Sequence, residues 1–129
     1  MPAASAIKVL VVDDQLTMRA LIRSALQEIG FRDIADAGDG EEGLKSLLGR
    51  QAHLVISDFN MPKMDGLGFL RAVRANDSTK KSAFIMLTGR ADKDLVQRAI
   101  QFGVNNYITK PFSPLQLRQK IEEVFGALT

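Results

Sequence analysis

The sequence predicts an α/β protein with a doubly wound fold, in which helices cover both faces of a five-stranded parallel sheet. Five short runs rich in aliphatic residues recur along the chain, and amphipathic segments with helical spacing lie between them. Nearly continuous apolar strands are typical of a sheet that is buried on both faces and connected by right-handed crossovers. With 129 residues, 46% of them apolar, one domain is expected. We therefore predict a single domain over residues 1–129, with a flexible N-terminal segment at residues 1–6.

The alternating apolar runs define the individual elements. The strands are expected at residues 7–12, 32–37, 54–57, 84–87 and 106–109. Helical spacing is shown in chain order by Leu21, Ile22, Ala25, Leu26 and Ile29, by Leu44, Leu47 and Leu48, by Leu67, Leu70 and Val73, by Val96, Ala99 and Ile100, and by Leu117, Ile121, Val124, Phe125 and Leu128. The start of the last helix is the best signalled. Ser113 can cap it, Pro114 suits its first position, and Gln116 completes a capping box.

Composition excludes several classes of function. The chain has no cysteine, so it forms no disulfides and no thiolate zinc site, which fits a reducing cytosol. The apolar run at residues 7–12 is too short for a signal sequence or a membrane span, and we expect a cytoplasmic protein without a membrane partner. The net charge is only +2 and no basic stripe is present, so no nucleic-acid partner is expected.

Chemically active side chains lie at the ends of four expected strands. Asp13 and Asp14 follow the first strand, Asp58 the third, Thr88 the fourth and Lys110 the fifth. In an open α/β sheet, ligands bind beyond the carboxyl ends of the strands near the point where the strand order reverses. We therefore expect three carboxylates, one hydroxyl and one ammonium group to converge at one edge.

Three clustered carboxylates repel one another, and such a cluster persists when a cation occupies it or when one member stays protonated. Magnesium prefers oxygen ligands and retains several waters, so Asp13, Asp14 and Asp58 suggest a Mg²⁺ site. Alternatively, one of the two adjacent aspartates caps the first helix, but capping alone does not explain Asp58 or Lys110. The single histidine, His53, begins a strand and is interpreted as structural or solvated rather than as a metal ligand.

Four motifs carry a resemblance to a known family. They are Leu-Val-Val-Asp-Asp at 10–14, Ser-Asp-Phe-Asn-Met-Pro-Lys-Met-Asp-Gly at 57–66, Thr-Gly at 88–89 and Lys-Pro-Phe at 110–112. Over almost the whole chain the sequence resembles response-regulator receiver domains, and within them the chemotaxis regulators that consist of a receiver alone. The resemblance implies a flavodoxin-like fold with strand order 2-1-3-4-5.

The resemblance also implies roles for the residues of the site. Asp58 would be the phosphoacceptor, and Asp13, Asp14 and Asp58 would bind Mg²⁺ together with the backbone carbonyl of Asn60. Lys110 would pair with a phosphoryl oxygen. Phosphoryl transfer depends mainly on positioning and on neutralising charge on the transferred oxygens, which a cation and an ammonium group supply. Such a protein is not a conventional enzyme: it catalyses its own phosphorylation from phosphohistidine and its own dephosphorylation.

A conformational switch is implied in the same way. After phosphorylation Thr88 would hydrogen-bond a phosphoryl oxygen and Tyr107 would swing inward behind it, changing the surface of the fourth helix, last strand and last helix. The Lys110–Pro111 bond is typically cis in the family. Arg90 replaces an acidic residue of a well-known enteric member, and Gly89 an alanine, so we hypothesise that Arg90 alters the lifetime of phosphorylated Asp58.

The resemblance implies partners as well. A chemotaxis-type histidine kinase would be the phosphoryl donor, a flagellar motor switch protein the target, and a phosphatase a further partner of a monomeric regulator. One alternative is a receiver that acts as a phosphate sink or phosphorelay intermediate without binding the motor. A flavin-binding electron carrier of the same topology is disfavoured, because Asp13 and Asp14 would repel its phosphate.

Overall fold

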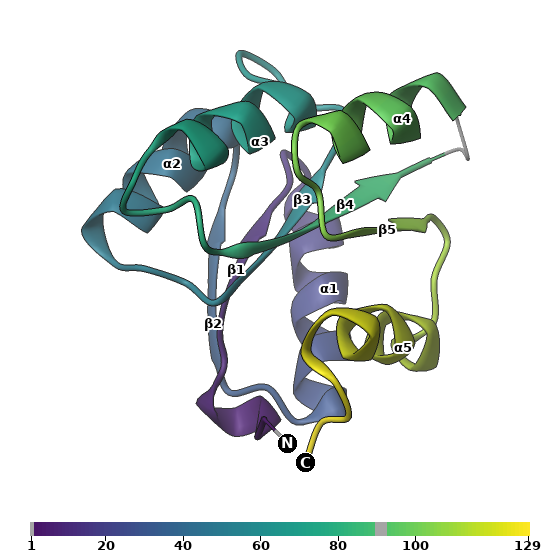
Figure 1. Cartoon of the computed structure of the whole chain (residues 1–129). Helices are drawn as coiled ribbons and strands as arrows, with labels where there is room; N and C mark the ends of the chain where they lie inside the picture. The colour runs from purple at the N-terminus through teal and green to yellow at the C-terminus, as the bar shows by residue number, and fades with distance from the viewer. Residues whose placement is uncertain (1, 90–92) are drawn as a thin grey trace.

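A computed structural model describes residues 2–89 and 93–129 and confirms the expected alternation of strands and helices (Figure 1). The elements in chain order are the short 3₁₀ helix η1 (Ala4–Ala6), β1 (Lys8–Val12), α1 (Leu16–Ile29), β2 (Asp33–Ala37), α2 (Gly40–Gly49), β3 (Leu54–Asp58), α3 (Gly66–Ala75), β4 (Ala83–Thr88), α4 (Lys93–Gln101), β5 (Asn106–Thr109) and α5 (Pro114–Phe125).

The five strands form one parallel sheet in the order β2-β1-β3-β4-β5, as expected. Two strands are longer than their apolar runs, because β3 extends to Asp58, which pairs with Leu87, and β4 extends to Thr88, which pairs with Thr109. The sheet therefore carries two of the polar side chains of interest on its own hydrogen-bonded ladder, where backbone pairing fixes their positions.

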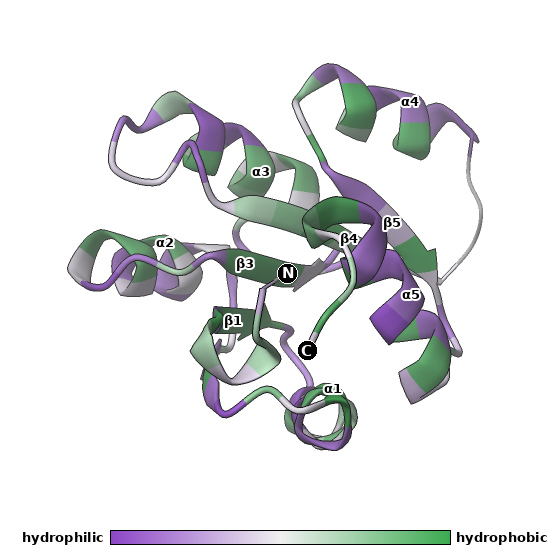
Figure 2. Cartoon of the chain, turned by 60° about the horizontal axis from the view of Figure 1, so that its bottom comes forward, coloured by the Kyte–Doolittle hydropathy of each residue, from purple (hydrophilic) through white to green (hydrophobic). Residues whose placement is uncertain are grey.

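Helices cover both faces of the sheet and divide the core into two clusters (Figure 1). One cluster lies under α1 and α5 and includes Ile22 and Leu117, whereas the other lies under α2, α3 and α4 and includes Phe69. Figure 2 shows β1 and β3 as strongly hydrophobic, in agreement with their complete burial after Lys8. Three residues that share the helical apolar spacing nevertheless face solvent, namely Leu21, Leu48 and Ile100.

The two ends of the chain lie side by side. The Ala4 N–H donates to the Thr129 carbonyl at 3.1 Å, and the Thr129 N–H donates to the Pro2 carbonyl at 3.0 Å. Ala4 is buried. The segment 1–6, expected to be flexible, thus contains a short helix whose first residue is packed and hydrogen-bonded. Among the described residues no helix is long and apolar enough to cross a membrane.

Arg74, near the end of α3, joins three segments of the chain. Its Nη1 donates to the carbonyls of Lys80 and Ser82 at 2.8 and 2.7 Å, and its Nη2 donates to the Gly103 carbonyl and the Asn105 Oδ1, both at 2.9 Å. Burial lowers the pKa of Arg74. Because the guanidinium presents donors in a fixed fork, one side chain holds the end of α3, the approach to β4 and the turn into β5 in one arrangement.

Candidate functional site

The ends of β1 and β3 bring three carboxylates together at one edge of the sheet. Ligand oxygens of Asp13, Asp14 and Asp58 all lie within 4.8 Å of one another, as the strand-end pattern predicts. Asp13 is 1% exposed and Asp58 7%, whereas Asp14 faces solvent. Parallel pairing of β1 with β3 sets this distance, since Val12 lies opposite Ser57 one residue before the two buried carboxylates.

The buried carboxylate of Asp13 is only half satisfied. Its Oδ1 accepts the Gln15 N–H at 2.9 Å, but its buried Oδ2 accepts no hydrogen bond from the described residues. Burial raises the pKa of Asp13, the Gln15 N–H opposes the rise, and the Asp58 charge adds to it. An orphaned anionic oxygen beside two further carboxylates fits a hard divalent cation, which supplies the missing positive charge. These residues therefore fit the Mg²⁺ that the resemblance implies.

Lys110 brings a positive charge to the same cluster. Its Nζ lies 2.8 Å from the Asp58 Oδ1 and 3.7 Å from the Asp13 Oδ2. The Lys110 N–H donates to the Thr88 carbonyl at 2.8 Å, so the backbone is anchored to the end of β4, and the Lys110–Pro111 bond is cis. Neutralisation by one ammonium is incomplete, because three carboxylates face one lysine among the described residues of the cluster.

The loop after Asp58 is fixed by residues that belong to the motif but for which the sequence indicates no role. The Gly66 N–H donates to the Phe59 carbonyl at 2.8 Å, and a Cβ at Gly66 would lie 2.6 Å from the Asp58 carbonyl oxygen. Only glycine allows this close approach between the start of α3 and the end of β3. A Cβ at Gly89, after β4, would meet no atom of residues 2–89 and 93–129 within 4 Å.

The same loop contacts the start of α2. Lys63 has a positive φ of 66°, and the Met64 N–H donates to the Pro62 carbonyl at 2.7 Å across it, which defines a γ-turn. The Lys63 Nζ lies 3.8 Å from the Asp39 Oδ2, and a Cβ at Gly40 would lie 3.0 Å from the Met64 sulfur. The spacing of Asp39 and Glu42, three residues apart, is typical of a helix N-cap, and Asp39 does cap α2. This pattern could have indicated the start of α2 in a segment that otherwise resembles a simple turn.

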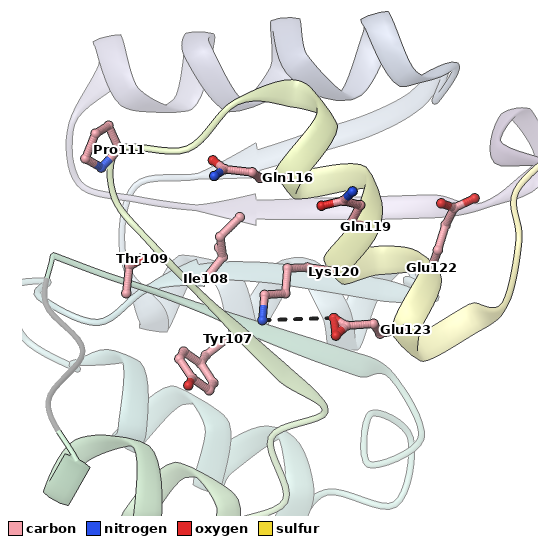
Figure 3. Close-up of a pocket in the computed structure, with 9 residues that line it drawn as sticks. All are labelled: Tyr107, Ile108, Thr109, Pro111, Gln116, Gln119, Lys120, Glu122 and Glu123. Carbon is pink, nitrogen blue, oxygen red and sulfur yellow. Dashed lines mark ion pairs between the residues drawn. The ribbon is translucent and has the colours of Figure 1, made fainter.

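The two residues predicted to switch lie on neighbouring strands. Thr88 is 4% exposed at the end of β4, and Tyr107 is half-buried on β5, opposite Met86. Figure 3 shows Tyr107 at the edge of a pocket between β5 and α5, with Lys120 reaching toward its ring. The Lys120 Nζ lies 5.2 Å from the ring centroid. Tyr107 also borders a second hollow beside α4, with Lys93, Val96 and Gln97.

Three further residues named in the sequence analysis are Asn60, His53 and Arg90. Asn60 is exposed two residues after Asp58, which is compatible with a carbonyl ligand. His53 lies just before β3, at the opposite end of the sheet, where it is exposed and its Nδ1 accepts the Lys8 N–H at 2.9 Å, in agreement with the interpretation as a structural or solvated residue. Arg90 lies outside the described residues, and its effect on lifetime stays a prediction.

Comparison with known proteins agrees with this arrangement. Residues 9–122 match the model of the response regulator receiver domain. The chain is 58% identical over 128 residues to a probable chemotaxis protein CheY of Rhizobium etli, covering 99% of both chains. It superimposes on the chemotaxis protein CheY4 of Vibrio cholerae with a TM-score of 0.85 and 32% identity, covering 96% of this chain and 99% of that one. A histidine-kinase receiver domain from Pseudomonas aeruginosa, with magnesium coordinated in its active-site cleft, gives 0.84 and 25% identity, with 94% and 98% coverage.

Proposed function

This chain belongs to the family of response regulator receiver domains, and we propose that it is a chemotaxis regulator whose phosphoacceptor is Asp58. The observation that carries the assignment is the contact of the Asp58 Oδ1 with the Lys110 Nζ at 2.8 Å, beside the orphaned Oδ2 of Asp13. Chemotaxis is the process named for the Rhizobium etli relative and for the Vibrio cholerae structure.

The arrangement of the Asp13, Asp14, Asp58 and Lys110 side chains supports phosphorylation of Asp58. One carboxylate oxygen of Asp58 attacks the phosphorus of a phosphohistidine, whose P–N bond breaks as the new P–O bond forms. Lys110, which now pairs with Asp58, then pairs with a transferred oxygen. Mg²⁺ bound by Asp13, Asp14, Asp58 and the Asn60 carbonyl would neutralise charge on the phosphoryl oxygens and would likewise assist hydrolysis by water. The protein thereby promotes its own phosphorylation and dephosphorylation without being a conventional enzyme.

The signal leaves the site through β4 and β5. The phosphoryl group offers new acceptor oxygens to the Thr88 hydroxyl, and Tyr107 moves inward as Thr88 is drawn toward Asp58. The surface of α4, β5 and α5 then binds its partner more tightly, by as much as that partner's affinities for the two states differ.

The expected partners are those of a cytoplasmic, monomeric chemotaxis regulator. A histidine kinase supplies the phosphoryl group, a flagellar motor switch protein reads the changed surface, and a phosphatase limits the signal. The second candidate is a phosphate sink or phosphorelay intermediate. Capture of the phosphorylated chain by flagellar switch components supports motor control, whereas a pure sink shows no phosphorylation-dependent capture.

Incubation with acetyl phosphate and Mg²⁺, followed by intact-mass measurement, tests the chemistry directly. Wild type gains one phosphoryl group, and Asp58→Asn, which keeps the shape of the side chain, gains none. Removal of Mg²⁺ with a chelator abolishes the adduct. A wild-type chain that remains unmodified in Mg²⁺, or an Asp58→Asn chain that is modified equally, refutes Asp58 as the acceptor.

A further inference from the structure

The ring of Tyr107 lies between an apolar core and a cation. On one side it packs against the core cluster under α2, α3 and α4, and on the other it borders the pocket between β5 and α5 (Figure 3). The Lys120 Nζ lies 5.2 Å from its centroid, within the range of a cation–π contact. Two different forces therefore act on the residue proposed to switch.

Lys120 is held near the ring by the residue that precedes Tyr107. The Asn106 Nδ2 donates to the Lys120 carbonyl at 2.9 Å and to the Glu123 Oε2 at 3.1 Å. The Glu123 Oε2 lies 3.9 Å from the Lys120 Nζ. The amide thus joins β5 to the turn of α5 that carries the cation, and the carboxylate keeps that cation on the Tyr107 side of the helix.

We infer that Lys120 is a positioning residue that holds the ring of Tyr107 in its resting place by a cation–π contact, and so sets how often the unphosphorylated protein adopts the switched arrangement. This inference rests on the proposed function, since it concerns the ring that the proposed switch moves. A half-exposed contact of this kind is worth a roughly two- to fivefold change in a two-state equilibrium. A partner that prefers the moved ring would bind the resting protein in proportion to that population, so Lys120 suppresses signalling without phosphorylation.

The competing explanation is that apolar packing alone keeps the ring in place. Tyr107 is half-buried against a large core cluster, and the Lys120 side chain is 33% exposed, so water screens its charge in part. The two explanations differ in one respect. Packing predicts that the charge of Lys120 is irrelevant, and the cation–π contact predicts that the charge is what matters.

The composition of the chain makes the ring directly observable. Tyr107 is the only tyrosine and the chain has no tryptophan. Ring-¹³C tyrosine labelling gives NMR signals from one side chain, and these are recorded in the full-length, unphosphorylated protein for wild type, Lys120→Met and Lys120→Arg. Lys120→Met removes the charge but keeps most of the alkyl chain, whereas Lys120→Arg keeps a cation. Lys45→Met, on α2, makes the same change in net charge far from the ring.

The expected result is a ring signal in Lys120→Met that moves toward its position in wild type saturated with beryllofluoride and Mg²⁺, consistent with a roughly two- to fivefold population change. Lys120→Arg stays near wild type, and so does Lys45→Met. A Lys120→Met signal that coincides with that of Lys45→Met overturns the inference, as does a Lys120→Arg signal displaced as far as that of Lys120→Met. Lys120→Gln replaces the methionine variant if circular dichroism shows that the latter is unfolded.

Failure of the proposed function would look different. If beryllofluoride and acetyl phosphate leave the wild-type ring signal unchanged, the switch by phosphorylation is rejected. The contact is then tested only by the difference between the Tyr107 ring signals of unphosphorylated Lys120→Met and Lys45→Met. Movement of the ring in Lys120→Met still supports the contact in that case, and coincidence still overturns it.

Discussion

Replacement of Asp13 by asparagine tests whether the carboxylate cluster is a cation site that destabilises the protein when no cation is bound. At an effective dielectric constant of about 20, repulsion between unit charges 4.8 Å apart amounts to about 3.5 kcal/mol, and attraction at 3.7 Å to about 4.5 kcal/mol. Asp13 faces two carboxylates and one ammonium, so its charge is unfavourable by up to about 2 kcal/mol once screening of the exposed Asp14 is allowed for. The asparagine side chain would keep an oxygen that accepts the Gln15 N–H.

We therefore expect Asp13→Asn to raise the free energy of unfolding by about 1–2 kcal/mol in buffer with chelator. Mg²⁺ at a concentration roughly a hundredfold above its Kd stabilises wild type by about 2.7 kcal/mol, and the variant binds it more weakly, so Mg²⁺ narrows the difference between the two stabilities. Urea unfolding followed by circular dichroism measures both conditions. Asp77→Asn removes an exposed carboxylate and is expected to change neither value.

An Asp13→Asn variant that is less stable than wild type in chelator would contradict this expectation. Equal stabilisation of the variant and of wild type by Mg²⁺ would contradict it as well. The first result would mean that Lys110 compensates the buried charge completely, and the second that Asp13 is not a ligand.

Four further substitutions test individual contacts through the free energy of unfolding. Gly66→Ala lowers it by at least about 2 kcal/mol, because the new Cβ would overlap the Asp58 carbonyl. Lys63→Gly raises it by up to about 1 kcal/mol, because relief of the positive φ exceeds the cost of a more flexible unfolded chain, and the exposed ion pair that it loses is worth little. Arg74→Lys lowers it by about 2–3 kcal/mol, because the fork of hydrogen bonds to three segments is lost. Ser113→Ala lowers it by about 1 kcal/mol through loss of the helix cap.

Matched variants separate these effects from the general cost of substitution. Gly49→Ala, where a Cβ meets nothing within 4 Å, should not destabilise, and Lys63→Ala should give no gain. Arg98→Lys, at an exposed position on α4, is the control for the buried arginine, and Ser113→Thr should preserve the cap. Equal losses in a variant and its control would contradict the contact concerned.

The strands and the convergence at their ends could be predicted because both follow from local pattern and parallel topology. Apolar runs marked all five strands to within a residue or two, and the carboxyl ends of parallel strands necessarily meet at one edge. The capping box of Ser113 and Gln116 at the N-terminus of α5 is also confirmed. It could be predicted because it depends only on neighbours in the chain.

Contacts between distant segments could not be predicted. In the sequence, nothing distinguishes Arg74 from any other arginine of a helix, because its partner, the Gly103 carbonyl, lies far along the chain. The contact of Lys63 with Asp39 likewise depends on how a loop packs against another helix. Apolar spacing likewise misplaced Leu21, Leu48 and Ile100, because helical periodicity gives the direction of the apolar face but not how far the core extends around the helix.

Gly66 and Gly89 differ in the room that the fold leaves beside each of them. At Gly66 the backbone contact is so close that even a methyl group would collide with the Asp58 carbonyl, whereas at Gly89 a methyl group would meet no atom of the described residues within 4 Å. Position 66 is therefore restricted to glycine by its neighbours, and position 89 can accept a larger residue without disturbing the described part of the chain.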